Sequence, residues 1–279
     1  MTSLQPYAFR GKTAVLTGAA SGIGEQLAYD LARRGSNLVL IDRDAAGLEA
    51  VAGKIRADGT VEVDAVVADL SDLDSLEALA AGIRARHRKI GLLVNNAGIA
   101  LGGLFEHLTV AEFESVLDVN FRAPVRLVHA LLPALLENPG SHLVNVSSLY
   151  GLIAPPGQSA YSASKFALRG FSEVLRSELD GRVGVTTVHP GGIRTKIAQN
   201  ARVGAGVPSD MIGEQRENFD KLLSYPPEKA AAEILDAVAR RKARLLIATT
   251  AKVPDLLARL MPVSHMRVLR RLTERRAGK

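Results

Sequence analysis

The segment Thr17-Gly18-Ala19-Ala20-Ser21-Gly22-Ile23-Gly24 stands between a short apolar run and a stretch of helical periodicity. Glycines permit a tight turn and let a ligand approach the backbone closely. A helix that begins in such a turn presents unpaired N–H groups and the positive end of its dipole to an anion. The segment therefore predicts a strand, a turn and a helix that together bind a pyrophosphate.

The spacing of these glycines is G-x-x-x-G-x-G, which is neither the G-x-G-x-x-G of the general dinucleotide fingerprint nor a P-loop. A P-loop needs Lys and Ser or Thr after its last glycine, whereas Glu25 and Gln26 follow Gly24 here. ATP or GTP hydrolysis is therefore disfavoured. Many glycine turns have only a steric role. The prediction of a nucleotide site therefore also needs signals from the rest of the chain.

Outward from this turn, short runs rich in β-branched residues and leucine alternate with helical segments, a pattern typical of βαβ units and a parallel sheet. The runs are continuously apolar, as expected where helices cover both faces of the sheet. We predict one α/β domain, in which residues 191–226 form a lid or loop because they lack periodicity. The predicted strands are Lys12–Thr17, Asn37–Asp42, Val61–Ala68, Ile90–Asn95, Ser141–Ser147, Val183–His189 and Arg244–Ile247.

The composition is that of an ordinary globular protein, with 47% hydrophobic residues in a chain of 279. No Cys is present, which excludes a disulfide framework, thiolate metal sites and cysteine nucleophiles. Met1–Arg10 lacks the apolar core of a signal peptide, and no apolar run reaches the length of a membrane-spanning helix. We therefore expect a cytoplasmic protein.

Basic residues are concentrated near the C-terminus. The net charge is +6, but residues 240–279 hold 12 Lys and Arg against 2 Asp and Glu, so the rest of the chain is slightly acidic. A nucleic-acid-binding body is disfavoured. We predict that residues 1–250 form the dinucleotide-binding and catalytic part and that 251–279 are a basic extension of the same domain.

Within residues 251–273, apolar side chains recur at helical spacing with arginines between them, and Pro262 interrupts the pattern. This pattern predicts an amphipathic surface helix. We favour packing of this helix on its own or a partner subunit, and contact with an anionic membrane is the alternative. The apolar positions are Val253, Leu256, Leu257, Leu260, Met266, Leu269 and Leu272, and the arginines are Arg259, Arg267, Arg270 and Arg271.

Tyr161 and Lys165 lie four residues apart in an uninterrupted helical pattern, so their side chains share one helix face. A free tyrosine has a pKa of about 10. A nearby ammonium group and ribose hydroxyls would lower that pKa and make Tyr161 a usable acid or base. We predict that Tyr161 takes the proton of an alcohol as hydride passes to a nicotinamide, and gives it back in reduction.

Two further residues suit the same chemistry. Ser148 ends a predicted strand 13 residues before Tyr161, and its hydroxyl is expected to position the substrate oxygen. Asn120 stands within a helix, where Asn is not favoured, and is expected to bend the helix and anchor a water that links Lys165 to solvent. A hydrolase would use Ser147 or Ser148 as nucleophile, but no G-x-S-x-G elbow surrounds either.

The histidines are scattered along the chain without the spacing of metal ligands, so no metal site is predicted. His189 is expected to end a buried strand.

Asp42 ends the second predicted strand 18 residues after Gly24, near the spacing at which a carboxylate binds the adenosine ribose. A carboxylate there accepts hydrogen bonds from the 2′ and 3′ hydroxyls and repels a 2′-phosphate, which favours NAD(H). Arg43 weakens this argument, because its guanidinium would pair with a 2′-phosphate if Asp42 turned away. NADP(H) is therefore the alternative cofactor.

Several segments occur together in the order of a known family: T-G-A-A-S-G-I-G (17–24), Asp69 after the third strand, N-N-A-G (95–98), Asn120 within D-V-N-F, Ser148 within N-V-S-S, Y-S-A-S-K (161–165) and P-G-G-I-R-T (190–195). With them the chain resembles the short-chain dehydrogenase/reductase family, closely over residues 8–195 and more loosely to Ile247. The resemblance implies a Rossmann-like, doubly wound sheet of about seven parallel strands and NAD(H) or NADP(H) as hydride carrier. It also implies dimers or tetramers formed through helices near residues 112–137 and 159–180.

The resemblance further implies roles for single residues. Asn120, Ser148, Tyr161 and Lys165 would form a catalytic tetrad. Asp69 would meet the adenine, Asn96 and Gly98 would line the adenosine ribose side, and Thr195 would hold the carboxamide side of the nicotinamide. Taken with the glycine turn and Asp42, the expected cofactor-binding residues are Gly18, Ser21, Gly22, Ile23, Gly24, Asp42, Arg43, Asp69, Leu70, Asn96, Ala97, Gly98, Tyr161, Lys165, Pro190, Gly191, Ile193 and Thr195.

Substrate-side residues are expected in the strand-end loops near the nicotinamide. The candidates are Leu149, Tyr150, Leu152, Ile153, Pro155 and Gly192, with the segment 196–226. Their apolar character favours a hydrophobic alcohol or ketone over a phosphorylated or strongly acidic metabolite. The sequence thus predicts an NAD(P)-dependent oxidoreductase that interconverts an alcohol and a carbonyl. The alternatives are a redox-silent dinucleotide-binding regulator on the same fold and a membrane-associated enzyme acting on lipid-like alcohols.

Overall fold

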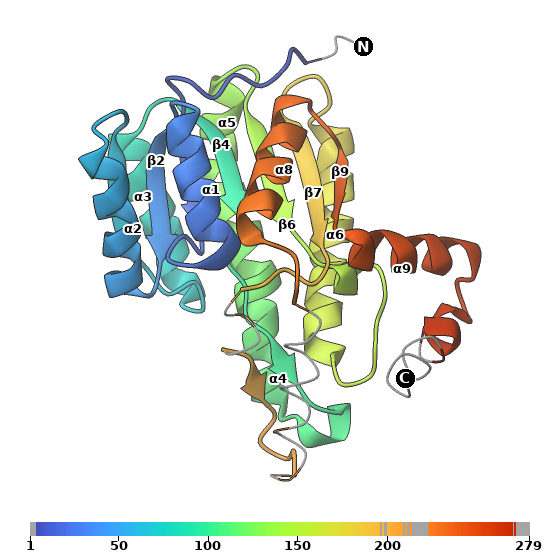
Figure 1. The fold of residues 1–279 in the computed structure, drawn as a ribbon. Coiled ribbons are helices and arrows are strands. Elements are labelled where there is room, and N and C mark those ends of the chain that lie inside the picture. The colour runs from blue at the N-terminus through green and yellow to red at the C-terminus, as the bar shows by residue number, and fades with distance from the viewer. Residues whose placement is uncertain are drawn as a thin grey trace.

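The computed structural model describes residues 4–195, 197, 200–208, 210, 213, 223–269 and 271. Seven parallel strands form one sheet in the order β3-β2-β1-β4-β6-β7-β9, which is a Rossmann-like single domain (Figure 1). Each strand lies within two residues of a predicted one, so the predicted strands and fold class are confirmed. The strands are β1 (Thr13–Thr17), β2 (Asn37–Asp42), β3 (Val63–Val67), β4 (Ile90–Asn95), β6 (His142–Val146), β7 (Gly184–Pro190) and β9 (Arg244–Ile247).

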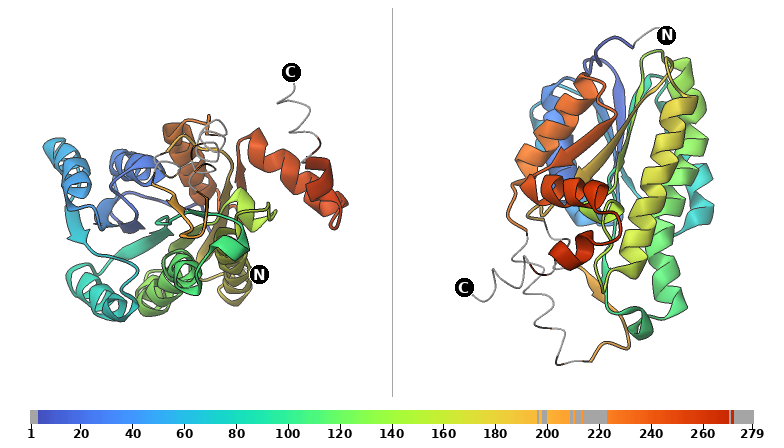
Figure 2. Two further views of the ribbon diagram at one scale, coloured as in Figure 1. Left: turned by 90° about the horizontal axis from the view of Figure 1, so that it is seen from below. Right: turned by 90° about the vertical axis from the view of Figure 1, so that its right-hand side faces the viewer.

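Helices cover both faces of the sheet (Figure 2). On one face lie α1 (Gly22–Arg33), α2 (Ala45–Ala57) and α8 (Pro227–Ala239), and on the other lie α3 (Leu76–Arg86), α5 (Ala123–Glu137) and α6 (Ser159–Glu178). Side chains of a strand alternate between the two cores. In β1, Leu16 packs in the core of the first face and Val15 in the core of the second. Burial against both layers fixes the register of the sheet.

The edge strand β3 departs from the expectation that both faces of every strand are covered. Its residues are only partly buried, and Val67 is 57% exposed. The reason is its place in the sheet, because β3 pairs with β2 alone. An apolar run in the sequence does not distinguish an edge strand from a central one.

The helix that carries Asn120 is interrupted, as the sequence suggested. The α4 helix (Val110–Leu117) continues through a π-helical turn at Asp118–Arg122 into α5. Such turns frequently occur at functional sites. The prediction was a bend at Asn120, and the structure shows a widened turn there that places Asn120 inside the protein.

Two short strands had no signal in the sequence. Leu101–Gly102 (β5) and Arg202–Val203 (β8) form a separate parallel pair. This pair joins the loop after β4 to the segment after β7. Pairs of two residues depend on contacts between distant parts of the chain, so local periodicity does not reveal them.

The C-terminal segment leaves β9 at the edge of the sheet where the parallel strands end. The α9 helix (Thr249–Leu260) projects from the body, the chain turns at 261–264, and residues 265–269 are helical again (Figure 1). The predicted amphipathic helix with a break near Pro262 is confirmed over this part, while Arg270 and Leu272 lie outside the described residues. Among the described helices, none is both long and apolar enough to cross a membrane.

Candidate active site

The glycine turn forms a cradle that side chains would fill. Gly18 has φ of +68°, and a Cβ added to it would lie 2.8 Å from the Cα of Ala97. A Cβ on Gly24 would lie 1.8 Å from the carbonyl oxygen of Gly18. The Ser21 side chain makes no capping hydrogen bond to α1, so it does not occupy the N–H groups of the first helical turn. The turn therefore fits a pyrophosphate.

The turn is fastened to the segment after β4. The hydroxyl of Thr17 accepts hydrogen bonds from the N–H groups of Asn96 and Ala97, at 3.0 and 3.1 Å. The Asn96 amide donates in return to the carbonyl oxygens of Thr17 and Gly18, at 3.0 and 3.1 Å. Sequence reasoning missed Thr17, and its position at the end of β1 was the available signal. The predicted place of Asn96 beside the ribose stays a prediction.

Asp42 is held against the glycine turn. One carboxylate oxygen accepts the N–H of Ala20 at 3.0 Å, and the other accepts the N–H of Asp44 at 3.0 Å. Both donors are backbone groups, so the carboxylate has no cationic partner in these bonds. Each oxygen keeps a lone pair for a ribose hydroxyl.

Asp69 lies at the end of the next strand. Its carboxylate accepts the N–H and the hydroxyl of Ser71, at 2.9 and 2.8 Å. These hydrogen bonds, led by the backbone N–H, hold the pKa of Asp69 below its usual value, and the charges of Arg43 and Arg202 add to the effect. Asp69 is therefore ionised at neutral pH and remains a hydrogen-bond acceptor.

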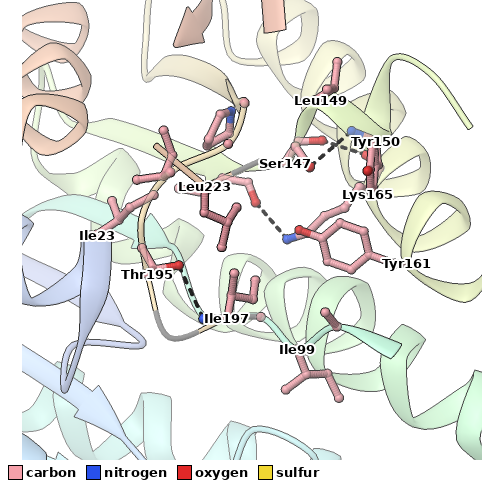
Figure 3. A pocket seen from close by; sticks show the side chains of 18 of the residues that line it. Ile23, Ile99, Ser147, Leu149, Tyr150, Tyr161, Lys165, Thr195, Ile197 and Leu223 are labelled. Atoms are coloured by element: carbon pink, nitrogen blue, oxygen red, sulfur yellow. Dashed lines mark hydrogen bonds between the residues drawn. The ribbon is translucent and has the colours of Figure 1, made fainter. Parts of the chain in front are cut away.

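The α6 helix places Tyr161 and Lys165 side by side, as predicted (Figure 3). Their exposed fractions are 9% and 3%. Lys165 Nζ donates to the carbonyl oxygen of Val146 at 3.0 Å and lies 5.6 Å from the centre of the Tyr161 ring. Burial lowers the pKa of Lys165 to about 8. The ammonium group is thus charged at neutral pH, with further N–H donors for a ligand.

The pKa of Tyr161 differs from the expectation. Burial raises it to about 12, the hydrogen bond with Ser148 lowers it, and the neighbouring Tyr150 raises it further. In the protein alone, burial therefore dominates the pKa of Tyr161. The predicted lowering by Lys165 together with ribose hydroxyls stays a prediction. Tyr161 is protonated at neutral pH and is ready to act as an acid.

Two adjacent serines have separate functions. Ser148 begins the short helix η4 (Leu149–Gly151), where its hydroxyl accepts the N–H of Tyr150 at 3.1 Å. The same hydroxyl is hydrogen-bonded to Tyr161. Its predicted role in positioning the substrate oxygen stays a prediction. Ser147 donates to the carbonyl oxygen of Lys165 at 2.9 Å and so fastens α6 to the end of β6. Neither serine is arranged as a nucleophile with a histidine base.

Asn120 lies behind this group. Its amide oxygen accepts the N–H of Ile99 at 2.9 Å, and its amide nitrogen donates to the carbonyl oxygen of Ile99 and the hydroxyl of Ser164, at 3.0 and 3.1 Å. A Cβ on Gly98 would lie 3.2 Å from Asn120 Oδ1 and 3.3 Å from Lys165 Nζ. Asn120 therefore lies close to the ammonium group, and the water relay assigned to it stays a prediction.

One cavity of about 1600 Å³ joins these residues. Pockets for a single drug-sized ligand occupy roughly 300–1,000 Å³, so this space accommodates a dinucleotide and a second molecule. Every expected cofactor-binding residue lines it except Gly24, which packs beneath the turn. Asn120 does not line the cavity either.

Within the described residues, no three His, Asp or Glu side chains gather into a possible metal site.

Most of the residues expected on the substrate side line the cavity. Of the candidates, Leu149, Tyr150, Ile153, Pro155 and Gly192 line the cavity. The prediction for Leu152 is wrong, because its side chain is buried and does not belong to the cavity wall. From the segment 196–226 the wall includes Ile197, Asn200, Arg202 and Leu223, and much of that segment lies outside the described residues.

The C-terminal segment also lines the cavity, which the sequence did not indicate. Thr250 accepts the N–H of Gly192 at 3.1 Å and so joins the start of α9 to the loop after β7. This contact depends on the chain returning to the sheet edge, so it has no local signal. The contributing residues are Thr249, Thr250, Val253, Pro254, Met266, Arg267, Leu269 and Arg271.

Comparison with known proteins agrees with this geometry. The model of the short chain dehydrogenase family matches residues 12–205. SadH of Mycobacterium tuberculosis is 40% identical over 265 residues, which cover 94% of this chain and 95% of that protein. Dehydrogenase/reductase SDR family member 7B of Xenopus laevis is 34% identical over 84% of this chain and 73% of its own.

Solved structures share the fold. A short chain dehydrogenase/reductase from Burkholderia phymatum in complex with NAD has a TM-score of 0.84 and 30% identity, covering 91% of this chain and 94% of that chain. A short-chain dehydrogenase from Sphingobium yanoikuyae in complex with NADPH has a TM-score of 0.74 and 30% identity, covering 88% and 92%. The family match, the glycine cradle and the Tyr161–Lys165 pair agree, and the chain belongs to the short-chain dehydrogenase/reductase family of dinucleotide-binding oxidoreductases.

Proposed function

We propose that this oxidoreductase interconverts an alcohol and a carbonyl, with Tyr161 as the acid and base. The observation that carries the proposal is the group formed by Tyr161, Ser148 and Lys165 in the same cavity as the glycine cradle. Nicotinamide, when bound, supplies or accepts the hydride at the substrate carbon. The protein then has to hold the substrate oxygen and move one proton.

In the direction of reduction, the hydroxyl groups of Ser148 and Tyr161 bind the carbonyl oxygen. As the carbon receives the hydride, the phenol gives its proton to that oxygen, and the product is the alcohol. The phenolate that remains is stabilised by the positive charge of Lys165. The raised pKa of Tyr161 suits this direction, because the phenol starts protonated.

In the direction of oxidation, Tyr161 has to lose its proton before it takes the proton of the alcohol. Lys165 and the ribose hydroxyls would lower the pKa of the phenol for this step. We assign Asn120 a positioning role, since it fixes Ile99 and Ser164 beside the ammonium group. The proposed relay would return protons to Lys165 from solvent along this side.

We favour NAD(H) as the cofactor and keep NADP(H) as the alternative. The support is Asp42, whose carboxylate is fixed beside the glycine turn by two backbone N–H groups. A carboxylate in that position repels a 2′-phosphate. Arg43 is the reason for the alternative, because its guanidinium also lines the cavity and would pair with a 2′-phosphate.

Homo-oligomers through α5 and α6 are a further proposal. On α6, Phe166 and Val174 are 40% and 55% exposed, and apolar groups on an outer helix face favour a partner. Replacement of Val174 by Arg is expected to lower the mass measured by light scattering, with Arg182→Ala as control. An unchanged mass for Val174→Arg would place the interface elsewhere.

For the C-terminal extension, we favour packing on its own subunit. The contacts of α9 with β9 and the loop after β7 support this interpretation. Peripheral contact with an anionic membrane is the alternative, because Val253, Leu256 and Leu260 remain exposed. Co-sedimentation with anionic liposomes compares the full chain with one ending at Thr250, and equal binding would exclude the membrane.

A screen of alcohols and ketones, followed by nicotinamide absorbance, tests the reaction. We expect turnover with apolar substrates, and a loss of about a thousandfold in kcat for Tyr161→Phe with nucleotide binding retained. Near-normal turnover of this variant would contradict the assignment of Tyr161. No turnover across broad substrate classes, with intact nucleotide binding, would favour the redox-silent regulator.

A further inference from the structure

The charges in the cavity wall are unevenly divided. The two carboxylates of the described wall, Asp42 and Asp69, lie at the carboxyl ends of the strands on the nucleotide side. The other charged side chains of the described wall are Lys165, the two arginines whose charges act on Asp69 (Arg43 and Arg202), and Arg267 and Arg271. Arg267 and Arg271 come from the C-terminal segment. We call the part of the cavity that this segment lines the far chamber, and its wall combines apolar side chains with these two cations.

The C-terminal segment is fixed in place by polar contacts at its start. Arg244 of β9 forms a two-point ion pair with Asp255 of α9, with distances of 3.2 and 2.5 Å. Asp255 is buried, so the pair anchors the helix where solvent does not screen it. Thr250 joins the first turn of α9 to Gly192. These contacts place α9 next to η4, which carries Leu149 and Tyr150 beside the catalytic tyrosine.

The chain then turns back towards the cavity. His265 Nδ1 lies 3.1 Å from the carbonyl oxygens of Met261 and Pro262, and the N–H of Arg267 donates to the carbonyl oxygen of Ser264 at 3.0 Å. Residues 265–269 are helical, and Met266, Arg267 and Leu269 line the cavity. The segment thus forms part of the cavity wall.

We propose that the far chamber binds a substrate with a long, unbranched apolar chain that ends in an anionic group. This inference rests on the proposed function, because the other end of the chain carries the carbonyl that meets Tyr161. The apolar side chains that the segment adds to the wall, Val253, Met266 and Leu269, take the methylene groups. Arg267 and Arg271 receive the terminal anion, for which a guanidinium supplies paired N–H donors. The chemical class is a keto or hydroxy acid whose carboxylate is remote from the reacting carbon.

The proposal refines the expectation of an uncharged hydrophobic substrate. That expectation rested on Leu149, Tyr150, Leu152, Ile153, Pro155 and Gly192, with the segment 196–226, as candidates that are largely apolar. The two arginines come from a segment that follows these candidates in the chain. The return of that segment to the cavity adds Arg267 and Arg271 to its wall.

The test is a series of linear methyl ketones that end in a carboxylate, each paired with its methyl ester. Burial of one methylene contributes about 0.8 kcal/mol, so kcat/KM is expected to rise up to about fourfold per methylene until the chain spans the chamber. Beyond that length, kcat/KM is expected to level off or fall. At the best length the acid is expected to exceed the ester.

Two variants locate the anion site and the end of the chamber. Arg267→Ala is expected to lower the ratio of kcat/KM for acid over ester about fivefold, whereas Arg259→Ala is expected to leave the ratio unchanged. Arg259 is an exposed arginine at the end of α9 that does not line the cavity, so it is a matched control. Met266→Trp is expected to shorten the best chain length, because the larger side chain fills part of the far chamber.

The outcomes separate this inference from the proposed function. Turnover of short ketones with no dependence on chain length, and an acid-to-ester ratio that Arg267→Ala does not change, would overturn the inference and leave the proposed function standing. If no ketone reacts, calorimetric binding of the long keto acid to the nucleotide-loaded protein decides. Binding that Arg267→Ala weakens and Arg259→Ala does not would support the chamber, and equal affinities would refute it.

Discussion

Each end of the central sheet holds a cation, half-buried Arg241 at one end and buried Lys165 at the other. The two cations differ in how many of their N–H groups donate hydrogen bonds to the protein. At the end where the strands begin, Arg241 donates to the carbonyl oxygens of Gln5, Gly140 and Ser141 and to His142 Nδ1, at 2.7–3.0 Å. At the end where the strands finish, Lys165 Nζ donates to one acceptor in the described part of the chain, the carbonyl oxygen of Val146.

Arg241 and Lys165 show how a charge that holds the structure together differs from one that is available to a ligand. Arg241 also stacks over the ring of Tyr7, with 5.1 Å between its Cζ and the ring centre, so its guanidinium closes that end of the sheet. Lys165 has N–H groups to spare and lines a cavity. A cation with most of its donors engaged by the protein holds loops together, whereas one with several donors to spare beside a cavity is suited to bind a ligand.

The largest expected effect is on turnover, at the end where the strands finish. Lys165→Met should lower kcat by about a thousandfold, because the phenolate of Tyr161 loses its stabilising charge. The free energy of unfolding should stay the same or rise, since a desolvated charge is replaced by an apolar side chain of similar size. Steady-state kinetics and urea denaturation of the same preparation measure both. A marked loss of stability would show that Lys165 is structural.

The opposite pattern is expected for Arg241→Met. The free energy of unfolding should fall by about 3 kcal/mol, because several buried carbonyl groups and His142 lose their hydrogen-bond donor. The value of kcat should stay within about twofold, since the residue lies far from the cavity. Denaturation midpoints together with kcat check this. A large fall in kcat with unchanged stability would refute the division between the two ends.

The pH dependence of kcat/KM should follow Lys165. Since burial lowers its pKa to about 8, the ammonium group is charged below that pH and neutral above it. We expect kcat/KM for the nucleotide to be level below about pH 8 and to fall up to tenfold per pH unit above it. Lys165→Arg should remove this limb, because arginine stays charged over the whole range. A limb that persists in this variant would have to arise from another group.

The smallest expected effect concerns two carboxylates. Asp42 accepts hydrogen bonds from backbone N–H groups and lines the cavity, whereas both oxygens of Asp255 are engaged by Arg244. Asp42→Asn should lower the preference for NAD(H) over NADP(H) about fivefold, because repulsion of a 2′-phosphate is lost. Asp255→Asn should leave the preference unchanged. The ratio of kcat/KM for the two cofactors measures it, and a strong NADP(H) preference of the unaltered protein would reverse the assignment.

Much of the fold could be predicted from the sequence, because the patterns that indicate its strands and helices lie within short stretches of the chain. The apolar runs and the glycine turn marked the seven strands of the sheet, and the helical spacing of Tyr161 and Lys165 marked one face of α6. The exposure of β3 was not predictable, since an apolar run is the same at the edge and in the centre of a sheet. The state of Tyr161 was not predictable either, because its pKa depends on burial by distant segments.

By itself, the sequence determined the order of the elements, the glycine turn and the pairing of Tyr161 with Lys165 on one helix face, since each depends on residues close together in the chain. Only the tertiary structure decided which groups surround that pair. It placed Asn120 behind the ammonium group, fastened the turn through Thr17, and brought Met266 and Arg267 to the wall of the cavity. The reason is physical: burial, desolvation and cavity shape depend on contacts between segments that no local pattern records.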